Sequence, residues 1–231
     1  MKIALMLTGG VRGFKHAFRT WDWMMAQVTD TYYFCSPLQP DETPIESLIP
    51  NAQGEYVEDD PWVERYTEGR GVPVHDRPAN SGHVAGPLMC CAIHNCFQRL
   101  LGHYDIVIRC RPDNFFGSGV SFESGLAQGP NAIWVPRFFS WGGYTDRFAF
   151  GGMDAMRVYS NFYFHLNDWT GEGEGVPCWS GNSETRLYHY LRKRCEVRRF
   201  DLRFCQVRAD GSLRNNIPEH LGLFDFDGRP L

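Results

Sequence analysis

Charged residues follow the most strongly apolar strand that the sequence predicts. Arg109, Arg111 and Asp113 lie in and directly after the apolar part of the segment 104–113, YDIVIRCRPD. Alternation along an extended strand places these three side chains on one face. Charges at the end of a buried strand are costly unless they meet a ligand or one another. We interpret the three residues as a nucleotide-binding group, with Asp113 holding a divalent cation, Mn²⁺ or Mg²⁺, that bridges a diphosphate. The alternative is an Arg–Asp ion pair that closes the strand.

A glycine-rich turn follows the first predicted strand. Its sequence is TGGVRG, residues 8–13. Glycines let backbone N–H groups approach a phosphate, the N-terminus of the next helix favours an anion, and an arginine adds a forked contact. We therefore expect Thr8, Gly9, Gly10 and Arg12 to bind the phosphates. The pattern is neither G-x-G-x-x-G nor a Walker A loop, so a standard dinucleotide site or P-loop is not expected. A tight turn with a surface arginine is the other interpretation.

Two further acids are candidates for proton transfer. Asp146 precedes the short apolar run FAF and follows a loop that contains Trp141 and Tyr144. Aromatic faces stack on sugar rings and carboxylates bind hydroxyls, so this loop is typical of a sugar site, although it could also be a capped turn. Glu184 is expected in the first turn of the last helix, where an acid is also a common capping or dipole residue. We predict Glu184 as the catalytic base, with Asp146 as the second candidate.

Composition bounds the class of protein. The chain has 231 residues, 43% of them apolar, so it can bury a large core. Its formal net charge is −4, so it has no overall electrostatic attraction to nucleic acid. No apolar run is long enough to span a membrane, and the apolar N-terminus is shorter than the core of a signal peptide. None of the eight cysteines forms a C-x-x-C pair. We expect buried free thiols in a reducing compartment, the cytoplasm.

The order of elements predicts an α/β fold. Apolar and β-branched runs indicate strands at 2–8, 31–35, 55–57, 104–110, 132–136 and 148–150, and helical spacing indicates helices at 14–28, 86–101, 153–165 and 183–194. Alternation of strand and helix favours a central, mostly parallel sheet flanked by helices, in one domain spanning 1–231. Residues 37–80 are rich in proline and acids and are interpreted as a variable excursion. Ligands of such sheets bind at the carboxyl ends of the strands, which is where the motifs above lie.

Three segments resemble a known family. KIALMLTGGVRGFKHAF, YDIVIRCRPDNFF and TDRFAFGGMDAMRVY occur in this order. They are similar to GT-A-like (Rossmann-like) glycosyltransferases of bacterial surface-polysaccharide clusters and large DNA viruses, which show a "YDxVIRxRxD" strand and an "NDxFAFGS…AM" segment. The resemblance covers residues 1 to about 191, apart from 37–80, and the central segment is its most specific part.

The resemblance implies roles for the candidate residues. Thr8, Gly9, Gly10 and Arg12 would lie near the nucleotide, Asp113 would occupy the last position of a D-x-D metal site, and Asp146 would contact the donor sugar or acceptor. Glu184 matches, by topology only, the base of inverting members. The first acid of the D-x-D is Arg111 in this chain, which puts metal dependence in doubt, and the usual Asn before Asp146 is Thr145.

The sequence thus predicts an enzyme that moves a sugar from a nucleoside-diphosphate sugar to an acceptor hydroxyl of a glycan or small molecule, as in polysaccharide synthesis. Two alternatives stay open. One is a nucleotidyl- or phosphotransferase, which should have two metal-binding acids after neighbouring strands. The other is a non-enzymatic carbohydrate-binding module, which could use the aromatic loop but would not need the buried charges of the central strand.

Overall fold

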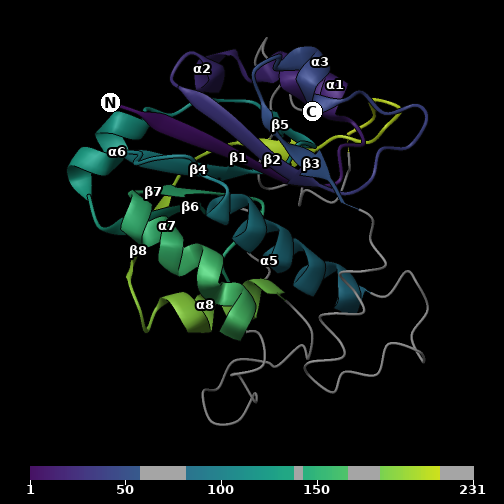
Figure 1. Cartoon of the computed structure of the whole chain (residues 1–231). Coiled ribbons are helices and arrows are strands. Elements are labelled where there is room, and N and C mark those ends of the chain that lie inside the picture. Colours follow the sequence, from purple (N-terminus) through teal and green to yellow (C-terminus); the bar gives the residue numbers. More distant parts are fainter. Residues whose placement is uncertain (58–81, 138–142, 166–182, 214–231) are drawn as a thin grey trace.

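The protein is built on a central sheet. The computed structural model describes residues 1–57, 82–137, 143–165 and 183–213, and seven strands of these residues form a sheet of order β3-β2-β1-β4-β7-β6-β8 (Figure 1). All of them run in the same direction except β7, which is antiparallel to both of its neighbours. The strands are β1 (Ile3–Gly9), β2 (Asp30–Cys35), β3 (Gln53–Tyr56), β4 (Ile106–Cys110), β6 (Ala132–Pro136), β7 (Phe148–Gly151) and β8 (Glu196–Phe200). The predicted α/β class with a mostly parallel sheet is confirmed.

Helices cover both faces of this sheet. On one face lie α5 (Gly82–Gln98), α7 (Met153–Ser160) with the 3₁₀ helix η2 (Asn161–His165), and α8 (Ser183–Leu191). The opposite face carries α1 (Phe14–Ala17), the 3₁₀ helix η1 (Phe18–Thr20), α2 (Asp22–Met25), α3 (Ile45–Leu48) and α6 (Phe122–Gln128) (Figure 1). A second, two-stranded sheet pairs β5 (Asn114–Phe116) with β9 (Phe204–Gln206) beside the end of β4.

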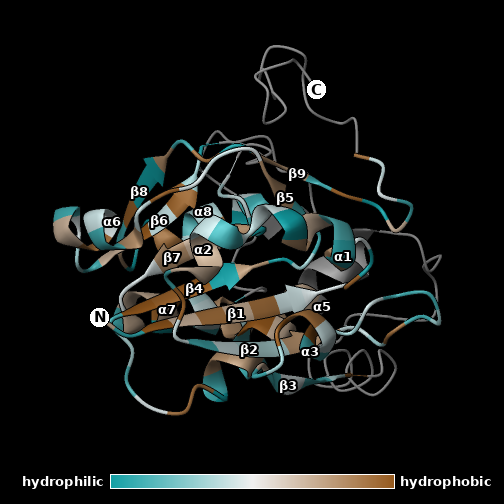
Figure 2. Ribbon diagram, turned by 90° about the horizontal axis from the view of Figure 1, so that it is seen from above, coloured by the Kyte–Doolittle hydropathy of each residue, from teal (hydrophilic) through white to brown (hydrophobic). Residues whose placement is uncertain are grey.

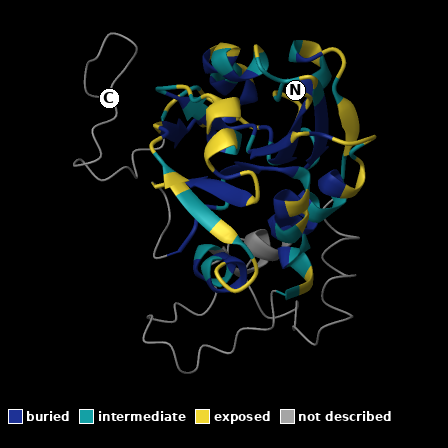
Figure 3. Ribbon diagram, turned by 90° about the vertical axis from the view of Figure 1, so that its left-hand side faces the viewer, coloured by how far each residue is buried: buried dark blue, intermediate teal, exposed yellow. Residues whose placement is uncertain are grey.

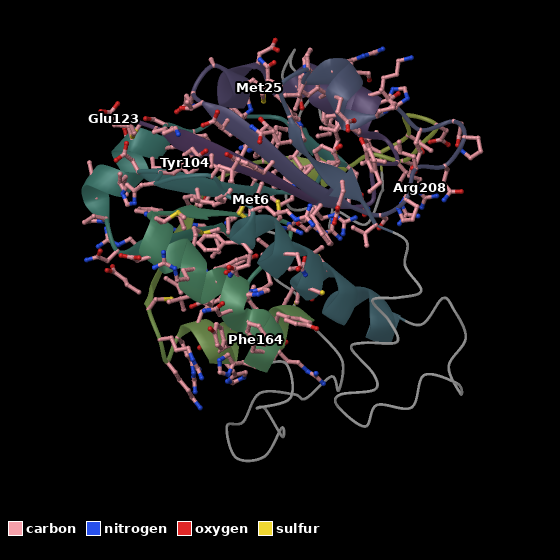
Figure 4. All side chains as sticks on the ribbon, viewed as in Figure 1. Met6, Met25, Tyr104, Glu123, Phe164 and Arg208 are labelled. Carbon is pink, nitrogen blue, oxygen red and sulfur yellow. The ribbon has the colours of Figure 1, made fainter. Side chains whose placement is uncertain are left out.

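The two faces of the sheet form two apolar layers. In β1, Ala4 and Met6 pack toward α5, while Ile3, Leu5 and Leu7 pack toward the opposite helices. Burial on both faces explains why β1 and β4 read as continuous apolar runs and appear largely brown in Figure 2. The edge strands β3 and β8 are the exceptions, since no residue of either is buried. The buried segments, dark blue in Figure 3, lie in the interior of the protein. Met6, labelled in Figure 4, marks the layer between β1 and α5.

The single helix expected at 14–28 is broken into three short pieces, α1, η1 and α2. Thr20 and Trp21 are engaged by residues far along the chain: the Trp21 indole donates to the carbonyl of Asn114 (2.7 Å), and the Thr20 hydroxyl accepts from the amide of Phe116 (2.9 Å). Trp21 has φ −98° and ψ 0°, outside the helical range. These contacts with β5 interrupt a pattern that is helical by spacing alone.

Other differences concern boundaries and short elements. Residues 37–57 contain the helix α3 as well as the expected short strand, and residues 58–80 of the predicted excursion lie outside the described part of the chain. The glycine-rich loop expected after 113 contains β5 and α6; a Ser121 hydroxyl that caps α6 by accepting from the Ser124 amide (3.3 Å) explains how a helix starts there. Helix 153–165 ends at Ser160 and continues as η2, helix 86–101 becomes 82–98, and helix 183–194 ends at Leu191.

The seven cysteines of the described part of the chain are free thiols, as expected, and Cys178 lies outside it. Six of the seven are buried, which shields them from solvent oxidants. In the described residues we find no helix whose length and apolar character would allow it to cross a bilayer.

Candidate functional site

The candidate site lies where the connections of the sheet change direction. β1 lies between β2 and β4 in the sheet. The chain therefore passes from β1 to β2 and β3 toward one edge of the sheet, and later enters β4 on the other side of β1. This is the topological switch point at which open α/β sheets bind ligands. The carboxyl ends of β1 and β4 bring Thr8 and Gly9 beside Arg111, whose Cγ lies 3.9 Å from where a Cβ on Gly9 would stand.

The antiparallel strand β7 adds a third segment to this place. Because β7 runs opposite to β4, its first residues meet the last residues of β4: Cys110 pairs with Phe148, and the Arg111 amide donates to the Arg147 carbonyl (3.1 Å). The segment around Asp146 is thereby joined to the segment 109–113. Two motifs that are separate in the sequence are therefore one site in the structure.

Asp113 forms a buried ion pair. Its side chain is 0% exposed, and Arg111 donates to both carboxylate oxygens, from Nε to Oδ1 (2.8 Å) and from Nη2 to Oδ2 (2.7 Å). Gln206, from β9, also donates to Oδ2. Burial alone would raise the pKa of Asp113, but the charge of Arg111 and the hydrogen bonds from Arg111 and Gln206 hold it below its ordinary value. We call Arg111, Asp113 and Gln206 the Asp113 cluster.

Arg109 is in a different situation. It points to the α5 side of the sheet, in register with Met6 of β1 and Ala149 of β7, and it is 0% exposed. No described residue supplies a hydrogen-bond partner for Nε, Nη1 or Nη2. Thr8, diagonally across from it on β1, is also 0% exposed and has a hydroxyl that makes no hydrogen bond within the described chain. A buried guanidinium without a partner is costly, and such groups concentrate at functional sites.

A small cavity of about 10 Å³, room for about one water molecule, lies on the α5 side of the sheet. Its lining includes Cys90 of α5, Asp146, Tyr159 of α7 and Leu187 of α8. Burial raises the pKa of both the Cys90 thiol and the Tyr159 hydroxyl, and the charges of Asp146 and Glu184 raise it further while Arg109 lowers it. Arg109 and the two acids therefore act electrostatically on the same two side chains. We use the name Arg109 pocket for these side chains together with Thr8: Thr8, Cys90, Arg109, Asp146, Tyr159 and Glu184. Of these, Cys90, Asp146 and Tyr159 line the cavity itself.

Backbone contacts join the start of α8, where Glu184 lies, to the residues before Asp146. The Tyr144 amide donates to the Glu184 carbonyl (3.1 Å), and a Cβ on Gly143 would overlap that carbonyl, so only glycine allows this approach. Arg199 of β8 donates to the Gly143 carbonyl (2.9 Å) and lies over the Tyr144 ring. These contacts join the residues before Asp146 to the start of α8. Trp141, the other aromatic residue expected in this loop, lies outside the described residues.

The structure of the glycine-rich turn has fewer features of a phosphate site than its sequence predicts. The helix that follows, α1, has four residues, so it lacks the macrodipole that a longer helix would direct at an anion. Its first residue is preceded by Gly13, which has φ +80° and packs against the carbonyls of Val207 and Arg208. Arg12 is exposed at the rim of the turn, and Gly9 and Gly10 are half-buried. Of the turn residues, Thr8 is the one that faces the α5 side with Arg109.

Three residues of the site were missed in the sequence. Arg147 lies at the same edge as Arg111, and its pKa is lowered by burial and by the charge of Arg111, with Asp146, Asp113 and Glu184 opposing that shift. Tyr159 is fully buried within a helical pattern that is also typical of core packing. Gln206 lies 93 residues after Asp113. The alternation of Arg147 with Ala149 along the strand could have identified Arg147; the other two depend on long-range contacts.

Asp113, the residue predicted to hold a metal, does not fit a cation as it is folded. Asp113 is buried, and both of its carboxylate oxygens accept hydrogen bonds from Arg111 or Gln206. This arrangement is the Arg–Asp ion pair that the sequence analysis gave as the alternative to a metal site. Among the described residues, no three His, Cys, Asp or Glu side chains come together as a metal site.

Comparison with known proteins adds no family. No protein-family model matches the chain, and a search of the curated proteins finds no significant relative.

Proposed function

We propose that the protein is a glycosyltransferase that moves a sugar from a nucleoside-diphosphate sugar to an acceptor hydroxyl of a glycan or small molecule, in the cytoplasm. The observation that carries the proposal is the Arg109 pocket at the switch point of an α/β sheet. It contains a buried guanidinium that has no hydrogen-bond partner among the described residues and that acts on the same two side chains as the carboxylates of Asp146 and Glu184. The resemblance of three segments to GT-A-like glycosyltransferases supports the same class.

Each group of the pocket has a role in such a transfer. A carboxylate, Glu184 in the first instance, accepts the proton of the acceptor hydroxyl while its oxygen attacks the anomeric carbon. The bond from that carbon to the phosphate oxygen breaks, and negative charge accumulates on the departing diphosphate. Cationic donors fixed at that point, Arg109 and Arg147, stabilise the charge without reorganising during the reaction. Asp146 binds sugar hydroxyls, or takes the place of Glu184 as base.

The class is tested with a panel of nucleotide sugars. We expect calorimetry to detect binding of at least one nucleoside diphosphate, and slow hydrolysis of the matching nucleotide sugar to release it. Binding of free sugars without any nucleotide would favour the carbohydrate-binding module, and transfer of a phosphoryl or nucleotidyl group would favour the phosphotransferase. Either of these results contradicts the proposal.

The base is tested by paired substitution. Glu184→Gln should bind the donor as the wild type does and turn over at least about a hundredfold more slowly, the usual scale for a lost general base. Glu196→Gln, at an exposed glutamate paired with Arg198, is the matched control and should turn over normally. If Asp146→Asn loses turnover and Glu184→Gln does not, the two roles are exchanged; Asp154→Asn, an exposed acid of α7, controls for that variant.

A further inference from the structure

The cations of this protein are concentrated in one segment of the chain. Residues 186–208 contain eight of the 23 arginines and lysines but only two of the 27 acids, although the chain as a whole has a formal net charge of −4. This segment runs from α8 through β8 to β9. Such an uneven distribution gives one part of the surface a positive potential that the net charge does not reveal.

Three consecutive cations follow α8. Arg192, Lys193 and Arg194 are exposed and lie in the turn that connects α8 to β8. The guanidinium carbon of Arg192 lies 5.4 Å from the centre of the Tyr188 ring, and that of Arg194 lies 4.3 Å from the centre of the Tyr190 ring. These contacts with rings of α8 fix where the two arginines stand, so the positive charge is held at one place on the surface.

A large apolar side chain is exposed beside this turn. Phe164, in η2, is 51% exposed, and Figure 4 shows it beside α8. Tyr190 connects the two places, because its ring stacks on that of His165, with centres 5.0 Å apart, and also lies under the Arg194 guanidinium. The phenyl group and the cations therefore belong to one part of the surface. We call Phe164, Arg192, Lys193 and Arg194 the α8-turn surface.

Stabilisation of α8 explains only part of this arrangement. Cations near the C-terminus of a helix interact favourably with its dipole, and Arg194 donates from Nη1 to the Tyr190 carbonyl (3.3 Å). The dipole does not require three consecutive cations, which repel one another. It also does not account for Phe164, which belongs to a different element. A single partner that accounts for both features has negative charge at its surface and an apolar interior.

An anionic lipid bilayer has both properties. Its headgroups attract arginine and lysine side chains, and an aromatic ring enters the boundary between headgroups and acyl chains. Double-stranded nucleic acid matches the cations but leaves the phenyl ring in water. Single-stranded nucleic acid is bound by several aromatic rings along a cationic groove, whereas Phe164 is the one exposed aromatic side chain among the residues that the structure describes. The lipid surface is thus the better match.

We propose that the α8-turn surface binds an anionic membrane surface, with the three cations on the headgroups and Phe164 between them and the acyl chains. The inference does not depend on the proposed function, because the recognition requires only headgroup charge and an apolar layer beneath it.

The first test measures binding to vesicles. The full chain is sedimented with vesicles of phosphatidylcholine alone and with vesicles of phosphatidylcholine and phosphatidylglycerol in equal amounts, at low salt and at about 0.5 M NaCl. We expect binding to the anionic vesicles only, weakened at least about tenfold by the salt, because the cations act through screened charges. Equal binding to both kinds of vesicle, or none to the anionic ones, overturns the proposal.

The second test removes charge from the α8-turn surface. The double variant Arg192→Gln, Lys193→Gln should bind anionic vesicles about twentyfold more weakly, since each cation near such a surface contributes about a factor of five. The matched control is the double variant Lys15→Gln, Arg19→Gln, which removes one exposed lysine and one exposed arginine from α1 and η1, on the opposite face of the sheet. The control should bind within about twofold of the wild type. Equal losses in the two double variants overturn the proposal.

The third test removes the phenyl group. Phe164→Ser should weaken binding to anionic vesicles at least about fivefold, because the ring no longer enters the acyl boundary, whereas Phe164→Leu should bind within about twofold of the wild type. Leu101→Ser, at a leucine 68% exposed between α5 and β4, is the control and should bind normally. Wild-type binding by Phe164→Ser contradicts the proposal. Should Phe164→Ser fail to fold, the double charge variants decide alone.

The outcomes separate this inference from its rival and from the proposed function. Binding of single-stranded DNA that depends on Arg192 and Lys193, without binding of anionic vesicles, contradicts the membrane surface. Binding of anionic vesicles without turnover of any nucleotide sugar supports the membrane surface and contradicts the glycosyltransferase. Turnover of a nucleotide sugar without binding of anionic vesicles supports the glycosyltransferase and contradicts the membrane surface.

Discussion

Arg109 and Asp113, which give their names to the Arg109 pocket and the Asp113 cluster, are only four residues apart in the chain, yet their charges have opposite surroundings. In the Asp113 cluster, both oxygens of a fully buried carboxylate accept hydrogen bonds from neighbouring side chains. In the Arg109 pocket, a fully buried guanidinium, a threonine hydroxyl and a tyrosine hydroxyl find no hydrogen-bond partner among the described residues.

The two regions differ in what a substitution is expected to do to stability. A buried ion pair whose hydrogen bonds are made favours one folded arrangement. When one partner is removed, the other stays buried and its desolvation is no longer offset. An unsatisfied buried group lowers stability in the free protein. Substitutions in the two regions should therefore change stability in opposite directions.

The largest effect is expected from Asp113→Asn. The variant leaves the Arg111 guanidinium, whose side chain is 19% exposed, without its anion, which should lower the free energy of unfolding by about 3–5 kcal/mol. Chemical denaturation at neutral pH measures it. Asp154→Asn, in an exposed pair with Arg157, is the control and should change stability by less than about 0.5 kcal/mol. Wild-type stability of Asp113→Asn would show that the cluster is not structural.

Acid should reproduce the same loss by protonating Asp113. Since the pKa of Asp113 is lower in the folded protein than in the unfolded chain, its contribution is complete above the unfolded value, about 3.9, and is lost as the pH falls through the folded value. Denaturation midpoints measured from pH 7 downward should thus fall more steeply at acid pH for the wild type than for Asp113→Asn. Parallel curves for the two proteins would rule out this source of acid sensitivity.

The strands and helices around both regions can be predicted from the sequence because each depends on a local pattern of residues. The apolar runs of β1 and β4 are strands buried on both faces, and α5 shows helical spacing. The switch-point location of the charges follows from that order of elements. Local patterns failed at Thr20 and Trp21, where bonds to Asn114 and Phe116 override helical spacing.

The contacts between side chains of the site cannot be predicted in the same way. Alternation along a strand anticipates that Arg111 and Asp113 meet, and they do. It does not show that Gln206, 93 residues further on, completes the pair, nor that Arg109 is left without a partner among the described residues. Tyr159 sits in a helical pattern typical of a core position, and its role depends on which strand ends lie beneath α7. Such facts depend on tertiary packing, which a single sequence specifies only indirectly.

A smaller effect than that of Asp113→Asn is expected from Gln206→Leu. The substitution removes one hydrogen bond to a buried carboxylate but leaves the Arg111 pair in place, so stability should fall by about 1.5–3 kcal/mol, the range for hydrogen bonds to charged groups. Chemical denaturation checks the value. A loss as large as that of Asp113→Asn would mean that Gln206 holds β9 in place by more than this contact.

The smallest effect distinguishes the two regions by its sign. Tyr159 and Tyr190 are both buried, at 2% and 7% exposure, and both pack in the layer of α5, α7 and α8. The Tyr190 hydroxyl donates to the Val158 carbonyl (2.9 Å), whereas the Tyr159 hydroxyl makes no hydrogen bond to the residues that the structure describes. Removing an unmade hydrogen bond relieves a desolvation cost, so Tyr159→Phe should raise the free energy of unfolding by up to about 1 kcal/mol, while Tyr190→Phe should lower it by about 1 kcal/mol. Both variants keep the ring and its packing, so chemical denaturation compares the hydroxyls alone. If Tyr159→Phe loses as much stability as Tyr190→Phe, the Tyr159 hydroxyl makes a hydrogen bond in solution. The Arg109 pocket would then resemble the Asp113 cluster more closely than the structure indicates.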